Sequence, residues 1–322
     1  MRILRTLGLL ALALALPIAA RAQGPYPAKP IRIIVPFAPG GGTDITARLV
    51  GAKLAETWGQ PVVMDNRPGA GTQIGTEIAQ RSAPDGYTLL IVAAAHSINP
   101  SLYRKVSYHP TKDFTPITMA ISFPFVLSTG LSIPVTTVKD LIALARAQSG
   151  KLSYASSGTG NTNHLAGELF KLMAGVDIVH VPVKGGGPAL NDVIGGQVTF
   201  QFGAVLQTLP QVRAGKLRGL AVSTPKRWPT ASDLPTLAET ALPGFNVTGW
   251  YGFLAPAGLP APVQAKLNTE MSRILGEGSV KERLVALGTE PWPTTPAEMR
   301  TWITEEHERW GKVIREARIK AE

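Results

Sequence analysis

The sequence contains no cysteine among its 322 residues. Disulfides, thiolate metal sites, iron–sulfur clusters and cysteine nucleophiles are therefore excluded. The five histidines show no His-x-x-x-His spacing, so we expect no zinc hydrolase and no metal site. No other cofactor is expected either. Only 17% of the residues are charged and 44% are hydrophobic, which excludes wholesale disorder and provides ample apolar surface for buried cores.

Long apolar runs are also scarce. The exception, Leu7 to Leu16, follows two arginines and precedes Ala20-Arg21-Ala22, which has small residues at the two positions that a signal peptidase reads. This order is typical of a secretory signal, so we predict that residues 1–22 are a signal peptide cleaved after Ala22. A retained anchor is the alternative, but the run is short for a membrane span and is broken by Pro17. The mature protein is therefore expected to be exported.

The charge is unbalanced but not clustered. Lysine and arginine number 32 against 22 acidic residues, which gives a formal net charge of +10. The basic residues are scattered, and no basic stripe is interleaved with aromatic residues, so we do not expect nucleic acid as a partner. The excess positive charge instead favours small anionic ligands.

Short apolar segments alternate with helical patterns along most of the chain. Ile31–Val35 and Tyr87–Val92 read as buried strands, and a helical pattern from Thr43 to Trp58 follows the first of them. This alternation predicts an α/β fold with parallel sheets covered by helices on both faces. Chain crossings near 115–123 and 221–225 would create two lobes. The predicted division is residues 24–120 plus 224–322 for lobe 1 and residues 121–223 for lobe 2.

Two glycine-rich turns lead from a predicted strand into a predicted helix. The first runs from Val35 to Asp44 and the second from Tyr154 to His164. Each places a helix N-terminus at the carboxyl edge of a sheet, where open α/β folds bind ligands. Free backbone N–H groups and the helix dipole favour an anion there. Ordinary helix caps have similar sequences, so each turn is also compatible with a purely structural role.

Particular side chains in these turns invite a functional interpretation. Asp44 either caps the first helical turn or orients a ligand group or an ordered water. His164 is either structural or in contact with the ligand. The second turn contains more polar side chains than one helix cap requires, namely Ser156, Ser157, Thr159, Asn161, Thr162 and Asn163.

Enzymatic interpretations find less support. The segment Gly40–Thr43 lacks the lysine of a P-loop. Neither Ser156 nor Ser157 has a glycine two residues before it, as a nucleophile elbow requires. An exported hydrolase or isomerase that uses Asp44, Ser157 or His164 remains the alternative, but no triad acid can be identified and no catalytic residue is predicted.

Many short motifs occur in a characteristic order along the mature chain. They include Pro36-Phe37-Ala38-Pro39-Gly40-Gly41, Asn66-Arg67-Pro68-Gly69-Ala70-Gly71, Ala83-Pro84-Asp85-Gly86-Tyr87, His164-Leu165-Ala166-Gly167-Glu168, Gly195-Gly196-Gln197 and Ala214-Gly215-Lys216-Leu217-Arg218. As a set, the sequence resembles the Bug-type periplasmic solute receptors of tripartite tricarboxylate transporters.

This resemblance implies a two-lobed type II periplasmic binding fold with two hinge crossings and no catalysis. It implies a monomeric receptor in the periplasm that closes on a small carboxylate, such as a di- or tricarboxylate or an aromatic acid. A membrane permease or a sensor domain would be the protein partner. An orphan signalling receptor is a further alternative.

The resemblance also implies where the ligand binds: the first turn, the second turn in the opposing lobe, and a flanking loop at Ala95–Ser97. The expected ligand-binding residues are Phe37, Gly40, Gly41, Gly42, Thr43, Asp44, Ala95, His96, Ser97, Ser156, Ser157, Gly158, Asn161, His164 and Gly203. Gly203 stands where the family often has an acid, which favours a ligand without a cationic group.

Overall fold

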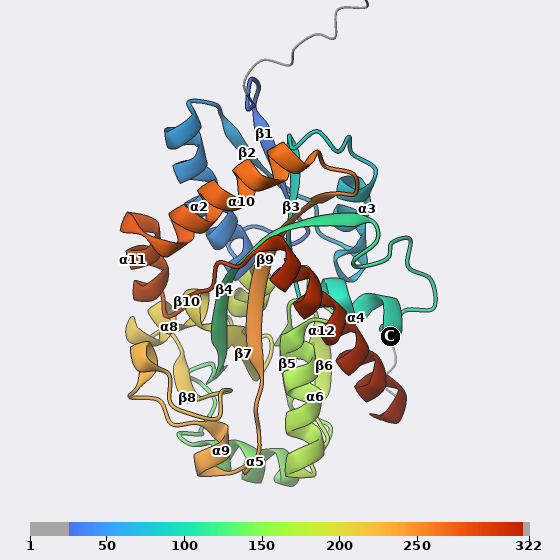
Figure 1. Ribbon diagram of the computed structural model, residues 1–322. Coiled ribbons are helices and arrows are strands. Elements are labelled where there is room, and N and C mark those ends of the chain that lie inside the picture. Colours follow the sequence, from blue (N-terminus) through green and yellow to red (C-terminus); the bar gives the residue numbers. More distant parts are fainter. Residues whose placement is uncertain (1–25, 318–322) are drawn as a thin grey trace, which may run out of the picture.

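The computed structural model describes residues 26–317, so the predicted signal peptide lies outside the described residues. Figure 1 shows two α/β halves, which we call lobe 1 (residues 26–122 and 250–317, at the top and along the lower right side) and lobe 2 (residues 125–247, at the bottom). Over the part of the chain that is described, no helix combines the length and the apolar character that a membrane crossing requires.

The sheet of lobe 1 has the order β2-β1-β3-β9-β4. Its first three strands are parallel: β1 (Ile31–Val35), β2 (Val62–Asn66) and β3 (Thr88–Ala93). Helices α2 (Gly42–Trp58) and α3 (Gln73–Gln80) connect them. Most of β1 and β3 is buried, because helices cover both faces of the sheet, and this explains their nearly continuous apolar sequences.

Lobe 2 repeats this plan. Its strands β5 (Ser153–Ser156), β6 (Val179–Pro182) and β7 (Phe200–Ala204) are parallel, and β8 (Arg218–Val222) lies across β4 from β7. The helices of this lobe are α5 (Val138–Ala147), α6 (Thr162–Ala174), α7 (Gly186–Ile194), α8 (Val205–Arg213) and the short α9 (Leu237–Thr240). Residue patterns predict the strands β5, β6, β7 and β8 and the helices α5, α6 and α7, whereas neither α8 nor α9 is predicted.

Two long strands join the lobes. Strand β4 (Phe114–Thr129) pairs with β9 (Thr248–Pro256) up to Pro124 and with β7 from Phe125 onward. Both crossing strands are antiparallel to their neighbours, so the sheets are mixed where the lobes meet. The two-lobed α/β fold predicted from the sequence is confirmed, and the two long strands β4 and β9 carry the chain between the lobes.

The chain returns to lobe 1 later than the sequence predicts. Val222 bridges to Thr236, and the Val247 nitrogen donates to the Ser223 carbonyl at 2.9 Å. Phe245 stacks on Phe202 of β7 with ring centroids 5.8 Å apart. Residues 224–247 therefore pack mainly on lobe 2, although Trp228 Nε1 also donates to the Gly288 carbonyl of lobe 1 at 2.6 Å. The second crossing lies at the start of β9.

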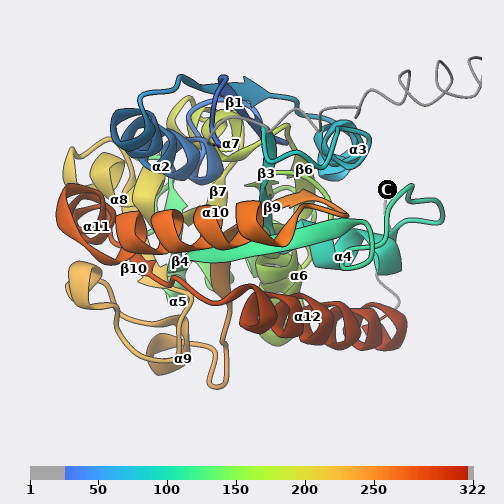
Figure 2. The same ribbon diagram turned by 45° about the horizontal axis from the view of Figure 1, so that its top comes forward.

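The remaining helices cover lobe 1. They are α4 (Ala95–Leu102), α10 (Ala261–Gly276), α11 (Gly278–Ala286) and α12 (Pro296–Ala317), and the two-residue strand β10 (Glu290–Pro291) pairs with β4. Figure 2 shows α10 beside α2, and α12 packs against α4. Thr137 and Thr295 each stand three residues before an acid, a pattern that predicts a capping box, and both boxes are formed. Ala95–Ser97, expected as a loop, is the first turn of α4.

Candidate functional site

The first glycine-rich turn is held in place by Asp44. Its Oδ2 accepts hydrogen bonds from the Gly40 nitrogen at 3.0 Å and from Arg48 Nε at 2.9 Å, and its Oδ1 accepts one from Asn66 Nδ2 at 3.0 Å. Burial favours the neutral acid, but these hydrogen bonds outweigh it, so the pKa of Asp44 is lowered. Because both oxygens are bonded within lobe 1, Asp44 braces the turn.

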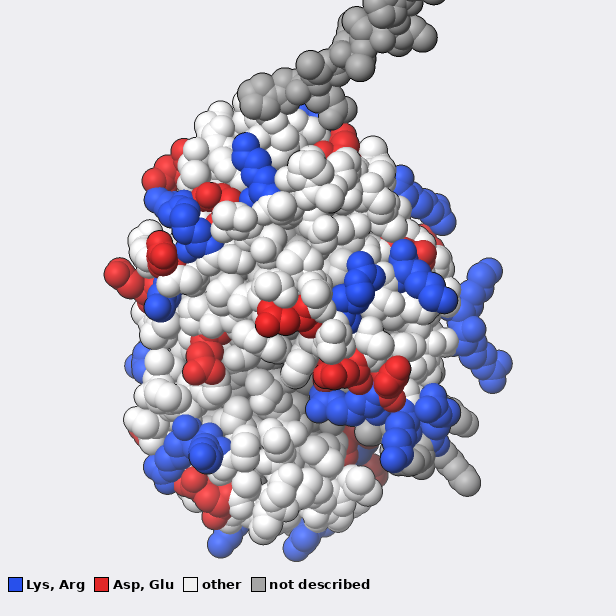
Figure 3. Space-filling view, in the orientation of Figure 1, with Lys and Arg blue, Asp and Glu red and all other residues white. Residues whose placement is uncertain are grey.

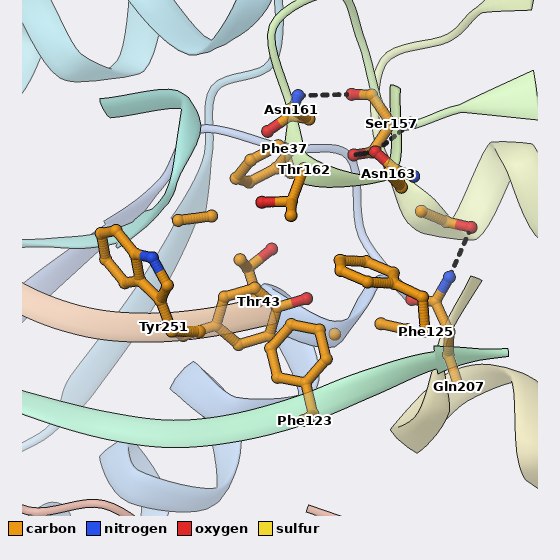
Figure 4. A pocket seen from close by; sticks show the side chains of 15 residues that line it. Phe37, Thr43, Phe123, Phe125, Ser157, Asn161, Thr162, Asn163, Gln207 and Tyr251 are labelled. Atoms are coloured by element: carbon orange, nitrogen blue, oxygen red, sulfur yellow. Dashed lines mark hydrogen bonds between the residues drawn. The ribbon is translucent and has the colours of Figure 1, made fainter. Parts of the chain in front are cut away.

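The second turn is held by its own polar side chains. Asn163 Oδ1 accepts hydrogen bonds from the Ser157 hydroxyl at 2.9 Å and from the Ser157 nitrogen at 3.4 Å (Figure 4). Asn161 Nδ2 donates to the carbonyl oxygens of Ser157 and Gly158. Gly160 has a φ of 85°, a conformation that glycine adopts at little cost. The unusual polar content of this turn therefore fixes its backbone as well as lining the site.

Two stacked histidines lie near this second turn. The rings of His164 and His180 are 4.2 Å apart, and His180 Nε2 is 2.7 Å from the Ser156 hydroxyl. Burial lowers the pKa of His164 to about 4 and that of His180 to about 3, so both rings are neutral at physiological pH. Ser157 donates to Asn163, and the Gly160 nitrogen donates to His164 Nδ1, so the Ser157–His164 pair considered from the sequence is not formed.

The N-termini of four helices lie around a cavity between the lobes. It is lined by the first or capping residues of four helices: Gly42 and Thr43 of α2, Asn161, Thr162 and Asn163 of α6, Gly186 of α7, and Ala204 before α8. None of these four helices has a side-chain hydrogen bond at its N-cap. Their first N–H groups and the positive ends of their dipoles are therefore directed at one region.

The rest of the cavity wall is aromatic and uncharged. Figure 4 shows Phe123, Phe125 and Tyr251 on one side of the cavity, with Asn161 and Asn163 opposite. Phe37 and Trp250 complete the aromatic wall, and none of the 15 lining residues is charged. An anion here would be held by backbone dipoles, while its carbon skeleton would contact rings.

The lobes are closed around this cavity. The Ala38 nitrogen of lobe 1 donates to the Lys184 carbonyl of lobe 2 at 2.8 Å, and the Tyr103 hydroxyl of lobe 1 donates to the Thr159 carbonyl of lobe 2 at 3.3 Å. The remaining volume is about 40 Å³. Small-molecule pockets typically measure roughly 300–1,000 Å³, so a ligand enters only when the lobes separate.

The structure brings together part of the residue set expected from the sequence. Those that line the cavity are Phe37, Gly42, Thr43, Ser157 and Asn161. Those outside its lining are Gly40, Gly41, Asp44, Ala95, His96, Ser97, Ser156, Gly158, His164 and Gly203. Several of the latter, including Asp44 and Ser156, position the turns that form the cavity.

His96 and Gly203 lie away from the cavity for clear reasons. The His96 ring stacks on Tyr108 and its Nε2 is 2.9 Å from the Pro110 carbonyl oxygen, so it is a core residue of lobe 1. Burial lowers the pKa of His96 to about 4. Gly203 lies under α8, where a β-carbon would be 2.2 Å from Thr208 Oγ1. It therefore leaves no gap in the cavity wall.

Sequence reasoning missed the residues contributed by the crossing strands and by α8. The missed lining residues are Ala93, Phe123, Phe125, Thr162, Asn163, Gly186, Ala204, Gln207, Trp250 and Tyr251. Thr162 and Asn163 are among the polar side chains of the second turn, and Gly186 lies in the segment Lys184–Pro188, whose sequence predicts the start of a helix. The aromatic residues read as ordinary core residues of strands, and nothing in their local pattern marks them as a binding surface.

These features define a class of protein: a two-lobed binding protein with its ligand cavity at the lobe interface. Among the residues described, no group of three or more histidine or acidic side chains is placed to hold a metal ion. Figure 3 shows basic and acidic side chains interspersed over one face of the molecule rather than gathered by sign.

Comparison with known proteins identifies the family. Residues 46–319 match the model for the tripartite tricarboxylate transporter family receptor, and the chain belongs to this family. It is 37% identical to the protein BugT of Bordetella pertussis over 297 residues, which is 92% of this chain and 91% of BugT. The resemblance to Bug-type receptors is thus confirmed, and the family's role is binding rather than catalysis.

Solved structures agree with this assignment. Rpa4515 of Rhodopseudomonas palustris, solved with adipate, has a TM-score of 0.87 and 40% identity, covering 90% of this chain and 97% of that one. MatC of the same organism, solved with malate, has a TM-score of 0.85 and 34% identity, covering 90% of this chain and 100% of that one.

Proposed function

We propose that this receptor captures a small organic carboxylate between its lobes. The observation that carries the proposal is the convergence of four helix N-termini, none with a side-chain N-cap, on one uncharged cavity. Each N-terminus favours negative charge, and no acidic side chain lines the cavity to repel it. The adipate and malate bound by the two similar proteins support the same ligand class.

Binding and closure are coupled in this proposal. Helix α2 belongs to lobe 1, whereas α6, α7 and α8 belong to lobe 2, so an anion gains contacts from both sides only when the lobes approach. The ligand therefore shifts the population toward the closed form. A micromolar affinity needs about −8 kcal/mol, which a few hydrogen bonds to a charged carboxylate and a desolvated aromatic wall can supply.

The proposed role is the delivery of this ligand in the periplasm. The export signal at residues 1–22 would direct the chain there. The closed monomer would then present the ligand to permease subunits of a tripartite tricarboxylate transporter, or to a sensor domain. Residues that line the cavity, with Thr43, Ser157 and Asn163 foremost among them, form the proposed ligand site.

The proposal is tested by comparing acids with their uncharged amides. Purified protein is titrated by calorimetry with succinate, malate, citrate, adipate and benzoate, and in parallel with succinamide, malamide, adipamide and benzamide. Binding of one or more acids, with at least tenfold weaker binding of the matching amide, is expected. Equal binding of an acid and its amide would contradict a role for the four helix N-termini.

A substitution inside the cavity gives a second test. Thr43 is 4% exposed and lines the cavity at the start of α2. Thr43→Asp places a fixed negative charge where the ligand carboxylate is expected, so binding should fall by at least tenfold. Thr43→Val, which is similar in shape and neutral, should reduce binding much less. Similar losses in both variants would argue for a steric effect and against an anion site.

A further inference from the structure

The amide of Gln207 is the unusual polar group in the cavity. It extends from α8 of lobe 2, and the residue is only 5% exposed. Its Nε2 donates a hydrogen bond to the Gly186 carbonyl at 2.8 Å, whereas its Oε1 is buried and has no hydrogen-bond partner. Of the described side chains that line the cavity, Gln207 is the only one with a buried oxygen or nitrogen that has no hydrogen-bond partner.

The orientation of this amide is fixed by its neighbours. A carbonyl oxygen can only accept, so the group that faces Gly186 O must be the Gln207 NH₂, and Oε1 is the acceptor. A β-carbon at Gly186 would lie 2.6–3.0 Å from the Gln207 amide, which shows how closely the amide packs on that backbone. In the flipped orientation, Gln207 Oε1 would face the Gly186 carbonyl oxygen, and the two oxygen atoms would repel each other.

The unpaired oxygen lies beside the backbone N–H groups proposed to hold the carboxylate. A β-carbon at Gly41 would be 3.6 Å from Gln207 Oε1 and 3.3 Å from the Gly186 nitrogen. An acceptor and a donor therefore lie close to the same point, on the surface of lobe 2 that faces the first turn. Figure 4 shows Gln207 next to Phe125 at the edge of the cavity.

From this arrangement we propose that Gln207 is a specificity residue that selects carboxylates carrying a hydroxyl group next to the carboxylate. The inference rests on the proposed function. The carboxylate oxygens accept from the backbone N–H groups, and the neighbouring hydroxyl donates to Gln207 Oε1. An acid without the hydroxyl leaves that oxygen buried and unpaired, which is costly.

A hydroxyl fits this position better than an ammonium group does. Both can donate to Gln207 Oε1, but the positive ends of four helix dipoles act on the same cavity and disfavour a cation. No acidic side chain lines the cavity to offset this effect. Malate should therefore bind better than aspartate, which carries an ammonium in place of the hydroxyl.

The experiment uses acids that differ by one group. Affinities of purified protein are measured by calorimetry for malate and succinate, citrate and tricarballylate, mandelate and phenylacetate, and aspartate. We expect the hydroxy acid of any pair that binds to be preferred by about 10- to 100-fold, because a buried acceptor is otherwise left unpaired. Equal affinities within pairs, or tighter binding of aspartate than of malate, would overturn this inference and leave the proposed function intact.

Variants then locate the selectivity. Gln207→Met has a similar length but cannot accept the hydroxyl hydrogen bond, so the preference should fall to about threefold or less. The matched control is Gln201→Met, because Gln201 is a buried glutamine in the adjacent β7 that does not line the cavity. It should keep the preference. If Gln207→Met also kept it, another group would be responsible and the assignment would be wrong.

The two proposals fail in distinguishable ways. If none of the acids binds, the proposed function fails and the role of Gln207 fails with it. If acids bind without a hydroxy preference, only the role of Gln207 fails. The wild-type pairs alone make this distinction, so the conclusion does not depend on whether the Gln207→Met variant folds.

Discussion

The Ala38 nitrogen donates a hydrogen bond to the Lys184 carbonyl oxygen at 2.8 Å, and this bond joins the two lobes. Ala38 lies in the turn between β1 and α2, and Lys184 lies in the turn between β6 and α7. These are two of the turns whose helices direct their N-termini at the cavity. The closing contact and the proposed anion site therefore share the same backbone, so movement of the lobes changes both together.

Gly187 offers a way to obstruct this closure. In the second position of α7, its added β-carbon would lie 2.6 Å from the Pro39 carbonyl oxygen of the opposing lobe. We predict that Gly187→Ala lowers carboxylate affinity by at least tenfold and increases the radius of gyration of the protein by small-angle scattering. The melting temperature should fall little, because alanine suits a helix better than glycine does.

Gly276→Ala is the matched control. Gly276 is also helical, in the last turn of α10, and its β-carbon would have no atom within 4 Å. This variant should retain both the affinity and the scattering profile of the wild type. Unchanged affinity in Gly187→Ala would mean that the closed contact seen here is not needed for ligand binding.

Asp44 should stabilise the first turn through its charge. Its pKa is lowered in the folded state, so the stability that it contributes is present above the unfolded value near 4 and is lost as the pH falls through the folded value. Asp44→Asn should cost about 1–3 kcal/mol at pH 7, because buried hydrogen bonds to a carboxylate are weakened. Chemical denaturation at pH 7 and pH 3 tests this, and the cost should shrink at the lower pH.

The variant Arg48→Ala separates the stability that the buried Asp44 contributes by bracing the turn from the stability that its ion pair with Arg48 contributes. The Arg48 side chain is 53% exposed, whereas that of Asp44 is 5% exposed. Arg48→Ala should therefore cost much less than Asp44→Asn, since the Gly40 and Asn66 hydrogen bonds remain. An equal loss in both variants would indicate that the ion pair, rather than the bracing of the turn, carries the stability.

The two halves of the site differ in how far the sequence predicts them. The turns before α2 and α6 were predictable, because strand, glycine and helix signals follow one another within a few residues. Phe123 and Trp250 were not, since they come from strands that meet only through long-range antiparallel pairing. Gln207 was missed for another reason: α8 begins directly after β7 at Val205, without a glycine turn or a capping side chain.

The division into lobes illustrates the same limit. The segment Ala221–Pro225 is predicted as a chain crossing, and the chain does leave β8 there. It then returns to the same lobe, because Thr236 bridges to Val222 and Phe245 stacks on Phe202. These contacts depend on side-chain packing between distant segments, which local pattern does not encode.

The two stacked histidines should make the folded protein less stable in acid. His164 and His180 have folded pKa values of about 4 and about 3, mainly because of burial, and Glu168 only partly offsets this for His164. Their unfolded value is near 6.5. The unfolded state therefore binds more protons below pH 6.5, and stability falls as the pH drops from there. The melting temperature should be lower at pH 5 than at pH 7.5.

His180→Phe tests this explanation. A phenyl ring can retain the stacking on Tyr154 and His164 but cannot take up a proton. The fall in melting temperature between pH 7.5 and pH 5 should therefore be smaller than in the wild type. At pH 7.5 the variant should be somewhat less stable, since the Ser156 hydroxyl loses its hydrogen bond to His180 and keeps only the one from the Gly158 nitrogen. A fall as large as in the wild type would assign the acid sensitivity to other groups.

Trp250 should report lobe movement by fluorescence. It lies in β9 just after the crossing, is 3% exposed, and lines both the ligand cavity and a second hollow on the side of α12. Its Nε1 donates to Glu306 Oε2 of α12 at 3.1 Å. Because closure changes the surroundings of this ring, a binding carboxylate should change the tryptophan emission. Trp250→Phe should remove more than half of that change.

Trp58 provides the control variant. It lies beside Tyr26 in lobe 1 and is outside the cavity lining. Trp58→Phe should therefore leave the change intact, with affinities checked by calorimetry. A signal that survives in Trp250→Phe would show that the ring does not sense closure.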